Sequence, residues 1–264
     1  MPTVSVNGIE LYYERAGEGS RVLFLNGSGV TLATMAPLIG VFASHLDVVA
    51  FDQRGLGKSA IPPGPYTMAD YASDALGVID AVGWSTCRVV GVSFGGMVAQ
   101  ELAVTAPARI DRLALLCTSP GGGGGASYPL HELAGMAPGR RAEISLPLLD
   151  SRFTAEWLAS HPRDRMLVEA RAQRGSGEVS DDVRRGEAEQ LEARRRHDVW
   201  DRLGRITCPT FVGAGRFDAI APLANSRAIV SRVAGATLHV YEGGHLFFAQ
   251  DRTALPEVIE FLRS

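Results

Sequence analysis

The chain has 264 residues and a formal net charge of −3, with 46% hydrophobic and 21% charged residues. This composition is typical of a soluble globular protein that can bury a sizeable core. The 26 lysines and arginines are outnumbered by 29 acidic residues. Because no excess of positive charge is available to neutralise phosphates, nucleic acid and membrane surfaces are both disfavoured as partners.

The three cysteines, Cys87, Cys117 and Cys208, are widely spaced and include no CxxC pair. Neither a disulfide framework nor a zinc site is therefore expected, and a reducing cytoplasm fits best. The first residues, MPTVSVNGIELYYE, lack the basic and apolar segments of a signal peptide. No run of about 18 apolar residues follows them, so we expect a cytoplasmic protein without a membrane span.

The first part of the chain predicts a hairpin followed by a strand, a helix and a second strand. The sequence alternates on both sides of Asn7-Gly8, a pair typical of a type I′ turn. Residues 22–29, VLFLNGSG, are a short apolar run that stops in glycine, and residues 47–52, DVVAFD, are another. The helical spacing of residues 32–44 between them indicates a strand–helix–strand unit.

A second series of elements begins at Thr67. A helix is predicted from there, with a capping box formed with Asp70 and a glycine stop at Gly83. The strand CRVVGVS leads without a spacer into the helix FGGMVAQELAVTAP, and the strand IDRLALLCTS comes next. Strands that are almost continuously apolar and alternate with helices indicate a parallel sheet that is covered on both faces.

The pattern changes after Ser119. Pro120 and the five glycines of residues 121–125 indicate a flexible joint. The interval that follows is helical, and the next strand, PTFVGAG, begins only at Pro209. A long helical interval between two strands indicates an insertion into the sheet pattern.

The sheet pattern is then completed by a helix at residues 222–233, the strand ATLHVYEG and a helix at residues 255–263. We expect an α/β fold with a doubly wound, mostly parallel β-sheet. Its core would be formed by residues 1–119 and 206–264, and residues 120–205 would form an inserted helical cap.

The cap contains the run Arg194-Arg195-Arg196, within SDDVRRGEAEQLEARRRHDVW. Such a run is either an anion site or a solvated helix face. Because acidic residues are interspersed with the arginines, the solvated face is favoured.

The segment Gly91-Val92-Ser93-Phe94-Gly95 has the spacing G-x-S-x-G and lies where a buried strand meets a helix. A serine at so sharp a turn takes strained backbone angles, and the residues two positions away must lack bulk. The turn lifts the Ser93 hydroxyl above the carboxyl edge of the sheet, where the backbone N–H of Phe94 can face a developing oxyanion. The pattern predicts a nucleophile elbow; a purely structural turn is the alternative.

A serine hydroxyl needs a base within hydrogen-bond reach, and that base needs an acid to orient it. His245 follows the strand ATLHVYEG, and Asp218 follows the strand PTFVGAG. The order Ser93, Asp218, His245 is that of a serine elbow on a doubly wound sheet. We predict a catalytic triad of these residues, with a helix N-cap as the alternative role of Asp218 and Glu242 as the reserve acid.

The second oxyanion donor is expected from the loop after the first parallel strand, because that loop lies beside the elbow. This loop has the sequence Asn26-Gly27-Ser28-Gly29. We predict that the N–H of Ser28 is the second oxyanion donor, with the N–H of Gly27 as the next candidate.

Residues 52–59 contain two glycines but lack the spacing of a P-loop or of GxGxxG, so nucleotide binding is not expected. We interpret this segment as a structural turn in which Asp52 and Arg54 tie neighbouring loops together.

Five segments together resemble the α/β-hydrolase superfamily over about residues 8–262: LFLNGSG, FDQRGLGKS, GVSFGGMVAQELA, GAGRFDAIAP and EGGHLFF. The segments DQRGLGKS and SFGGMVAQELA are similar to 3-oxoadipate enol-lactonases, related esterases and cofactor-free haloperoxidases. NGSG resembles the HGSG loop of meta-cleavage C–C hydrolases. Asn26-Gly27 stands where the superfamily usually has His-Gly, and the asparagine slightly favours the enol-lactonases, which often have one in this loop.

The triad and the resemblance imply a hydrolase of carboxylic esters or lactones that works through an acyl-enzyme, without a metal or other cofactor. The substrate would be small and largely apolar, and the protein a monomer or homodimer. The expected substrate pocket lies between cap and core and is lined by Asn26, Met97, Tyr128, Phe153 and Trp157. Plain packing is the alternative for each aromatic residue.

Two other enzyme classes use the same residues. A meta-cleavage C–C hydrolase would act on a vinylogous diketone, and in a haloperoxidase-like enzyme peroxide would intercept the acyl intermediate. A hydrolase-fold ligand sensor, which binds without turnover, is the alternative from another class. Movement of the cap on the glycine run is a further hypothesis.

Overall fold

The sheet of the computed structural model, which describes residues 2–174 and 180–264, has eight strands in the order β1-β2-β4-β3-β5-β6-β7-β8. The strands are β1 (Thr3–Val6), β2 (Ile9–Ala16), β3 (Arg21–Leu25), β4 (Asp47–Phe51), β5 (Cys87–Val92), β6 (Ile110–Leu116), β7 (Thr210–Gly215) and β8 (Thr237–Tyr241). Neighbouring strands from β4 to β8 are parallel, whereas β2 is antiparallel to both β1 and β4. The predicted mostly parallel sheet is therefore confirmed.

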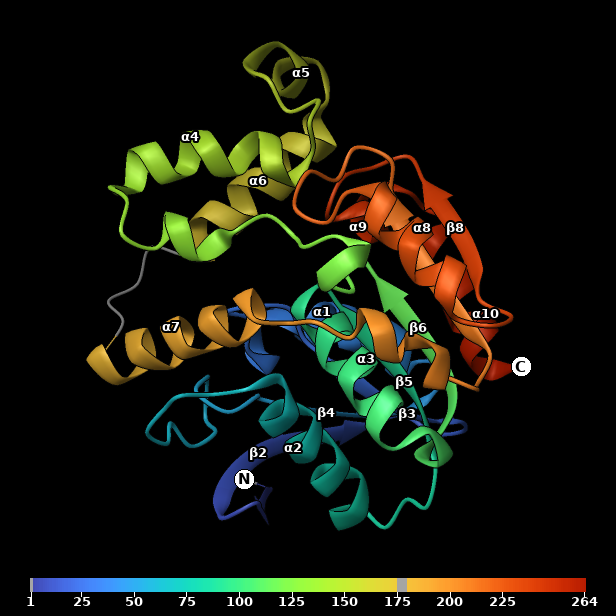
Figure 1. Ribbon diagram of the computed structural model, residues 1–264. Coiled ribbons are helices and arrows are strands. Elements are labelled where there is room, and N and C mark those ends of the chain that lie inside the picture. The colour runs from blue at the N-terminus through green and yellow to red at the C-terminus, as the bar shows by residue number, and fades with distance from the viewer. Residues whose placement is uncertain (1, 175–179) are drawn as a thin grey trace.

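The helices connect these strands and fill the interval between β6 and β7 (Figure 1). They are α1 (Leu32–Ala43), α2 (Met68–Ala81), α3 (Phe94–Thr105), α4 (Pro138–Leu149), α5 (Ala155–Ser160), α6 (Pro162–Arg174), α7 (Asp181–Arg195), α8 (Leu223–Arg232), α9 (Phe247–Gln250) and α10 (Ala254–Arg263). Short 3-10 turns are η1 (Pro107–Arg109), η2 (Gly122–Gly124), η3 (Leu130–Leu133) and η4 (Trp200–Arg205). None of the helices within the described residues is long and apolar enough to cross a membrane.

Two local predictions can be checked directly. Asn7 and Gly8 have φ angles of 51° and 76°, so both central positions of the hairpin are left-handed, as a type I′ turn requires. At the start of α2, the Thr67 side chain accepts from the N–H of Asp70, whose carboxylate accepts from the N–H of Thr67. Both the hairpin turn and the capping box are confirmed.

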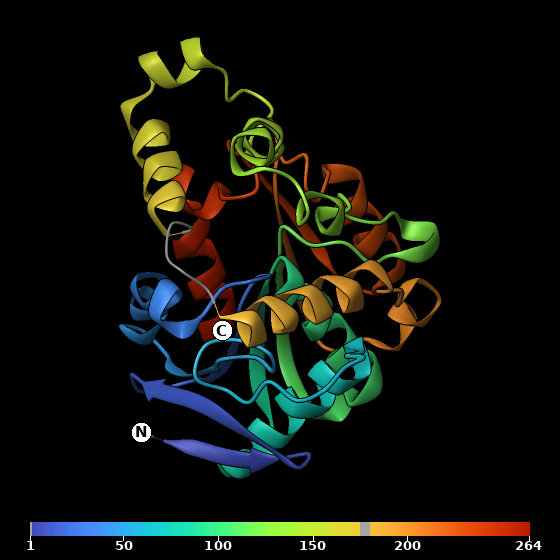
Figure 2. The ribbon, with the colours of Figure 1, turned by 90° about the vertical axis from the view of Figure 1, so that its left-hand side faces the viewer.

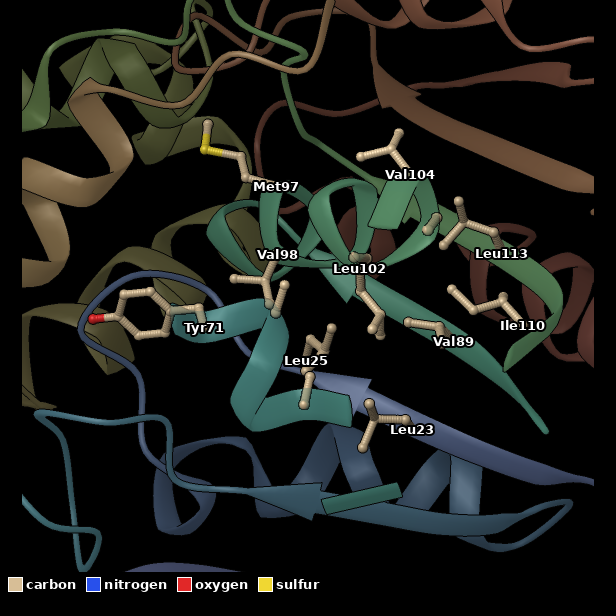
Figure 3. Packing of buried hydrophobic residues seen from close by; sticks show 14 of the residues in the cluster. Leu23, Leu25, Tyr71, Val89, Met97, Val98, Leu102, Val104, Ile110 and Leu113 are labelled. Atoms are coloured by element: carbon tan, nitrogen blue, oxygen red, sulfur yellow. The ribbon is translucent and has the colours of Figure 1, made fainter. Parts of the chain in front are cut away.

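Alternate side chains of each buried strand enter different clusters on the two faces of the sheet. Leu23 and Leu25 of β3 pack under α2 and α3 (Figure 3). Ile229 of α8 belongs to the same cluster. Val22 and Phe24 point to the other face, which α1 and α10 cover. This period of two places helices on both faces, so the sheet is doubly wound as predicted.

Residues 120–205, the proposed cap, divide into two parts. Figures 1 and 2 show α4, α5 and α6 extending beyond the sheet, with α7 between them and the core. Leu149 and Phe153 form a small cluster with Ile220 of the core, separate from the main clusters. Ala193 and Leu203, by contrast, belong to the main cluster under α3 and α8. The end of the segment is thus packed into the core, and we keep residues 120–205 as the proposed unit.

The glycine run is packed, although the sequence predicts a flexible joint. A Cβ added to Gly121 would lie 2.0 Å from the carbonyl oxygen of His197, and one added to Gly124 would lie 2.4 Å from the Trp200 ring. Gly121 also forms a β-bridge with Asp198. Glycine is required here because neighbouring chain fills the space that a side chain would occupy.

Candidate active site

Ser93 stands between the last residue of β5 and the first residue of α3. Its φ of 56° and ψ of −113° lie outside the common regions, which is the strained geometry expected of a nucleophile elbow. The strain is held by the surroundings, since the N–H of Ser93 donates to the carbonyl of Leu116 at 2.8 Å. The sharp turn aims the hydroxyl at the carboxyl edge of the sheet.

The two glycines of the motif make the turn possible. A Cβ on Gly91 would lie 2.4 Å from the carbonyl oxygen of Gly95. One on Gly95 would lie 2.0 Å from the carbonyl oxygen of Leu25. Both obstacles are backbone atoms that cannot rotate away, so neither position tolerates a side chain.

The side chains of Ser93, His245 and Asp218 form one hydrogen-bonded series. His245 Nε2 lies 2.9 Å from Ser93 Oγ, and His245 Nδ1 lies 2.8 Å from Asp218 Oδ2. The three residues are between 6% and 8% exposed, so water has little access to the series. The structure brings together the triad that the sequence predicts from three distant segments.

Asp218 is held by its own loop. Its Oδ1 accepts from the N–H groups of Ile220 at 2.8 Å and Ala221 at 2.9 Å. Because these two bonds occupy one carboxylate oxygen, the other oxygen faces His245. Asp218 thus contacts the imidazole, as the predicted triad requires, and the N-cap residue of α8 is Pro222.

A short strap of the cap, residues 148–151, binds the loops that carry the acid and the base. Leu149 O accepts from the N–H of His245 at 2.6 Å, and Leu148 O accepts from the N–H of Ala219 at 3.2 Å. The N–H of Ser151 donates to Phe217 O at 2.9 Å. The last two residues of α4 and the two residues that follow them therefore fix the backbone on both sides of the His245–Asp218 contact.

Side chains extend this strap. Gln250 Oε1 accepts from the N–H of Gly244, and Gln250 Nε2 donates to Asp150 Oδ2 at 2.9 Å. Asp150 also accepts two bonds from Arg152, at 2.9 Å from Nε and 2.6 Å from Nη2. Burial alone would raise the pKa of Asp150, but the hydrogen bonds from Arg152 and Gln250 hold that pKa below its ordinary value.

The predicted oxyanion donors lie beside the elbow. The N–H of Phe94 is at the first position of α3, where a helix leaves its donors without intrahelical acceptors. A Cβ built on Gly27 would lie 3.7 Å from the Cβ of Ser93, so the loop with Ser28 is adjacent to the nucleophile. The side chain of Asn26 is buried, and within the described part of the chain neither of its polar atoms has a hydrogen-bond partner.

The five predicted pocket residues fall into different surroundings. Met97 and Tyr128 line one cavity under α7, and Asn26 lies in the loop beside the elbow. Phe153 is buried in the cap cluster, and Trp157 packs against the same cluster. The Trp157 ring stacks on His161, with the ring centroids 3.7 Å apart.

The remaining candidates have structural contacts. Glu242, the reserve acid, is exposed and pairs with Arg216 at 2.6 Å. Asp52 accepts from the N–H groups of Leu32 and Lys58, so it ties loops together as predicted. Among the residues that the structure describes, no group of three or more His, Cys, Asp or Glu side chains could hold a metal ion.

Sequence reasoning missed several residues that surround the site. Gln190 Oε1 accepts from the N–H of Gly29 at 2.7 Å and ties α7 to the loop of residues 26–29, from which the second oxyanion donor is predicted. Arg194, four residues further along α7, is buried rather than solvated. Asp150 and Gln250 hold the histidine loop, as described above. The run Arg194-Arg195-Arg196 is the sequence signal that pointed to Arg194. An anion site is one of the two interpretations of this run, but the sequence favours a solvated helix face.

Comparisons with known proteins all find similarity to hydrolases. A family model described as the alpha/beta hydrolase fold matches residues 21–251. The chain is 34% identical over 250 residues to "Putative carbamate hydrolase RutD" of Variovorax paradoxus, which covers 89% of each protein. It is 31% identical over 241 residues to the 2-hydroxymuconate semialdehyde hydrolase of Pseudomonas putida, covering 87% of this chain and 82% of that protein. The crystal structure of the enol-lactonase from Burkholderia xenovorans LB400 has a TM-score of 0.81 and 26% identity, over 100% of both chains.

Proposed function

The chain belongs to the α/β hydrolase fold family, and from this premise we propose that it is a serine hydrolase of carboxylic esters or lactones. The observation that carries the proposal is the continuous series from Ser93 Oγ through His245 to Asp218, with contacts of 2.9 Å and 2.8 Å. A serine hydroxyl is a weak nucleophile at neutral pH, and a base in direct contact is what activates it. No other titratable group is needed for acyl transfer.

The geometry supports a two-step reaction. Ser93 Oγ attacks the substrate carbonyl while His245 Nε2 takes the hydroxyl proton, and Asp218 stabilises the imidazolium that forms. The proton then passes from His245 to the leaving oxygen, which departs and leaves an acyl group on Ser93. Water attacks this acyl-enzyme with His245 as base and restores the serine.

The oxyanion of each tetrahedral intermediate needs two donors. The N–H groups of Phe94 and Ser28 are the proposed pair, with Gly27 as the alternative for the second. Since the donors are backbone groups, the asparagine at position 26 does not remove them. Donors that are already in place stabilise the transition state without a cost of reorganisation.

The first experiment is turnover of short-chain nitrophenyl esters and of a lactone. We expect steady turnover by the wild type and a loss of about ten-thousand-fold or more in kcat in Ser93→Ala, because the nucleophile is removed. Ser231→Ala is the control, since its hydroxyl lies on the exposed surface of α8 and donates to Ala228 O in the same helix. Undiminished turnover by Ser93→Ala would contradict the proposal.

A second candidate function is hydrolysis of a C–C bond in a vinylogous diketone. It is supported by the relative named 2-hydroxymuconate semialdehyde hydrolase, at 31% identity over most of both chains. A substrate panel that contains ring-fission diketones beside esters and enol-lactones ranks the two functions by kcat/KM. A wild type that binds these compounds but turns over none of them would point to a ligand sensor instead.

A further inference from the structure

Arg194 differs from the two arginines that follow it in the chain. Arg195 and Arg196 are exposed and pair with Glu192 at 2.6 Å and 2.5 Å, as expected for a solvated helix face. Arg194 points inward from α7 and is only 5% exposed. The expectation of a solvated face is therefore wrong for this one residue, because helical periodicity turns it toward the core.

The guanidinium of Arg194 is buried with most of its donors unused. Nη1 donates to the carbonyl of Tyr128 at 2.8 Å, but Nε and Nη2 are buried and have no hydrogen-bond partner among the residues that the structure describes. Within residues 2–174 and 180–264, no carboxylate forms an ion pair with Arg194. Burial lowers the pKa of Arg194 to about 10, so the group is still cationic at neutral pH. A buried cation without a counter-ion is strongly disfavoured unless something else neutralises it.

The free edge of this guanidinium has the shape of a carboxylate site. Arg54 binds Asp74 through Nε and one Nη, and Arg152 binds Asp150 through the same pair of atoms. That pair forms a planar fork that matches the two oxygens of a carboxylate. Arg194 leaves the corresponding pair, Nε and Nη2, unoccupied.

Arg194 forms part of the wall of a cavity of about 100 Å³ between α7 and α3, together with Met97, Ser119, Tyr128 and His197. Within the described part of the chain, none of the residues that line this cavity is acidic. Burial lowers the pKa of His197 to about 3, so its ring is uncharged at neutral pH and can donate one N–H. The cavity thus has one buried cation that forms no ion pair within the described residues, and room for a small group.

The cavity is next to the nucleophile. Met97 is one helical turn after Ser93 and donates its N–H to Ser93 O at 3.2 Å. Thr118, which precedes the lining residue Ser119, donates its hydroxyl to the same oxygen at 2.8 Å. The charge of Asp218 also acts on Arg194, although the two side chains form no ion pair. The cavity therefore lies beside the backbone of Ser93.

We propose that Arg194 binds a carboxylate of the substrate, so that the ester or lactone carries a single negative charge at the end remote from the scissile carbonyl. This inference rests on the proposed function. It gives one cationic end to a pocket that the sequence predicts to be largely apolar. The Nε and Nη2 atoms of Arg194 can bind the two oxygens of one carboxylate. A bound carboxylate would neutralise the buried charge of Arg194.

The test uses nitrophenyl half-esters of glutaric, adipic, pimelic and suberic acid. Each is compared with the uncharged nitrophenyl ester of the alkanoic acid of equal chain length. We expect the wild type to prefer at least one half-ester by about tenfold or more in kcat/KM, as a charge-assisted bidentate contact implies. A wild type without preference for any half-ester would overturn the proposal.

The variant Arg194→Met removes the charge and keeps the length of the side chain. The ratio of the two kcat/KM values is expected to fall to about one, while Arg194→Lys restores part of it because it keeps the charge without the fork. Arg196→Gln, on the exposed face of the same helix end, is the control and keeps the wild-type ratio. An equal loss on charged and uncharged esters in Arg194→Met would show that Arg194 only supports Asp218 or the fold, and would overturn the proposal.

Binding separates this proposal from the proposed function. Half-amides of the same acids, which do not react readily, are titrated calorimetrically into the wild type and into Ser93→Ala, beside the uncharged alkanoic amides. Binding of a half-amide at least about tenfold tighter than its uncharged match supports the anion site even where no ester is turned over. Equal binding of the two would overturn it, and this comparison holds where Arg194→Met fails to fold.

Discussion

At the level of single residues, the two carboxylate oxygens of Asp218 have different hydrogen-bond partners, and this difference sets the tautomer of His245. Oδ1 is occupied by the N–H groups of Ile220 and Ala221, and only Oδ2 faces the imidazole. A carboxylate oxygen can only accept, so Nδ1 must carry the proton and Nε2 is left as an acceptor for the hydroxyl of Ser93. The imidazole therefore presents an unprotonated Nε2 to the Ser93 hydroxyl, which is the form that the proposed mechanism needs.

Asp218→Asn tests this directly. If the amide oxygen keeps the two backbone bonds, the amide NH2 faces Nδ1 and donates to it, so the proton moves to Nε2 and the base is blocked. We expect kcat to fall by about a thousandfold to ten-thousand-fold with little change in the unfolding midpoint. Asp201→Asn, an exposed change on η4, is the control. Near-normal kcat in Asp218→Asn would show that Asp218 does not set the tautomer.

Not every residue of the site could be predicted from the sequence. Ser93 sits in a local motif, and Asp218 and His245 follow apolar strands, so parallel topology alone brings all three to one edge of the sheet. Arg194 and Gln190 lie on a polar helix, where sequence does not reveal which face is turned inward. Their roles depend on how α7 is placed against the core, which is a long-range packing outcome.

At the scale of elements, the predicted strands and core helices agree with the structure to within a few residues, because hydrophobic periodicity is local. α9 (Phe247–Gln250) is not among the predicted elements, since a four-residue helix is too short to show a period. The antiparallel contact of β2 with β4 is also outside the prediction, because pairing across the sheet is not visible in either strand alone. The strap of residues 148–151, at the end of α4, likewise forms through tertiary contacts that its own sequence does not show.

Asp150 is the charged residue of this strap, so the contribution of the strap to stability depends on the ionisation of Asp150 and therefore on pH. Its folded pKa lies below the ordinary value, since hydrogen bonds from Arg152 and Gln250 outweigh the burial that would raise it. A depressed folded pKa contributes stability above the unfolded pKa of about 4, and this contribution is lost as pH falls through the folded pKa. The side chain of Asp150 is fully buried, so solvent does not screen these bonds.

Asp150→Asn should therefore destabilise the protein most at neutral pH. We expect the free energy of unfolding to fall by about 1–3 kcal/mol there, because Arg152 loses its charged partner. Below about pH 4 the difference from the wild type should shrink. Urea unfolding at several pH values measures both. Asp181→Asn removes an almost fully exposed ion pair with Arg184 and should change stability little at any pH. A deficit of Asp150→Asn that is the same in acid as at neutral pH would contradict this role.

In the molecule as a whole, three residues on one face of α7 are turned toward the core, each at a different place along the helix. Gly186, Gln190 and Arg194 are four residues apart and therefore lie along the same face of the helix. Gly186 packs on the backbone of Gly55, Gln190 binds the N–H of Gly29 in the oxyanion loop, and Arg194 lines the cavity beside Ser93. The position of α7 over the core thus affects both the loop of residues 26–29 and the proposed carboxylate subsite.

Gly186→Ala should disturb this arrangement from a distance. A Cβ at position 186 would lie 2.1 Å from the carbonyl oxygen of Gly55 and 2.8 Å from its carbonyl carbon. These are backbone atoms, so α7 must lift away from the core, which weakens the contact of Gln190 with Gly29. We expect a loss of about 1–3 kcal/mol in stability, faster hydrogen exchange at the Gly29 amide and a lower kcat/KM for nitrophenyl esters.

The matched control is Gly139→Ala, because that glycine lies on the cap helix α4 with nothing within 4 Å of an added Cβ. Alanine there should leave stability unchanged or raise it slightly, and the Gly29 amide should exchange as in the wild type. The two variants make the same chemical change in two cap helices and differ in whether the helix touches the core. The contrary outcome is that both variants leave hydrogen exchange at the Gly29 amide and ester turnover unchanged. In that case the close packing of α7 on Gly55 would not hold the site in place, and contacts within the core alone would position the Ser93, Asp218 and His245 side chains.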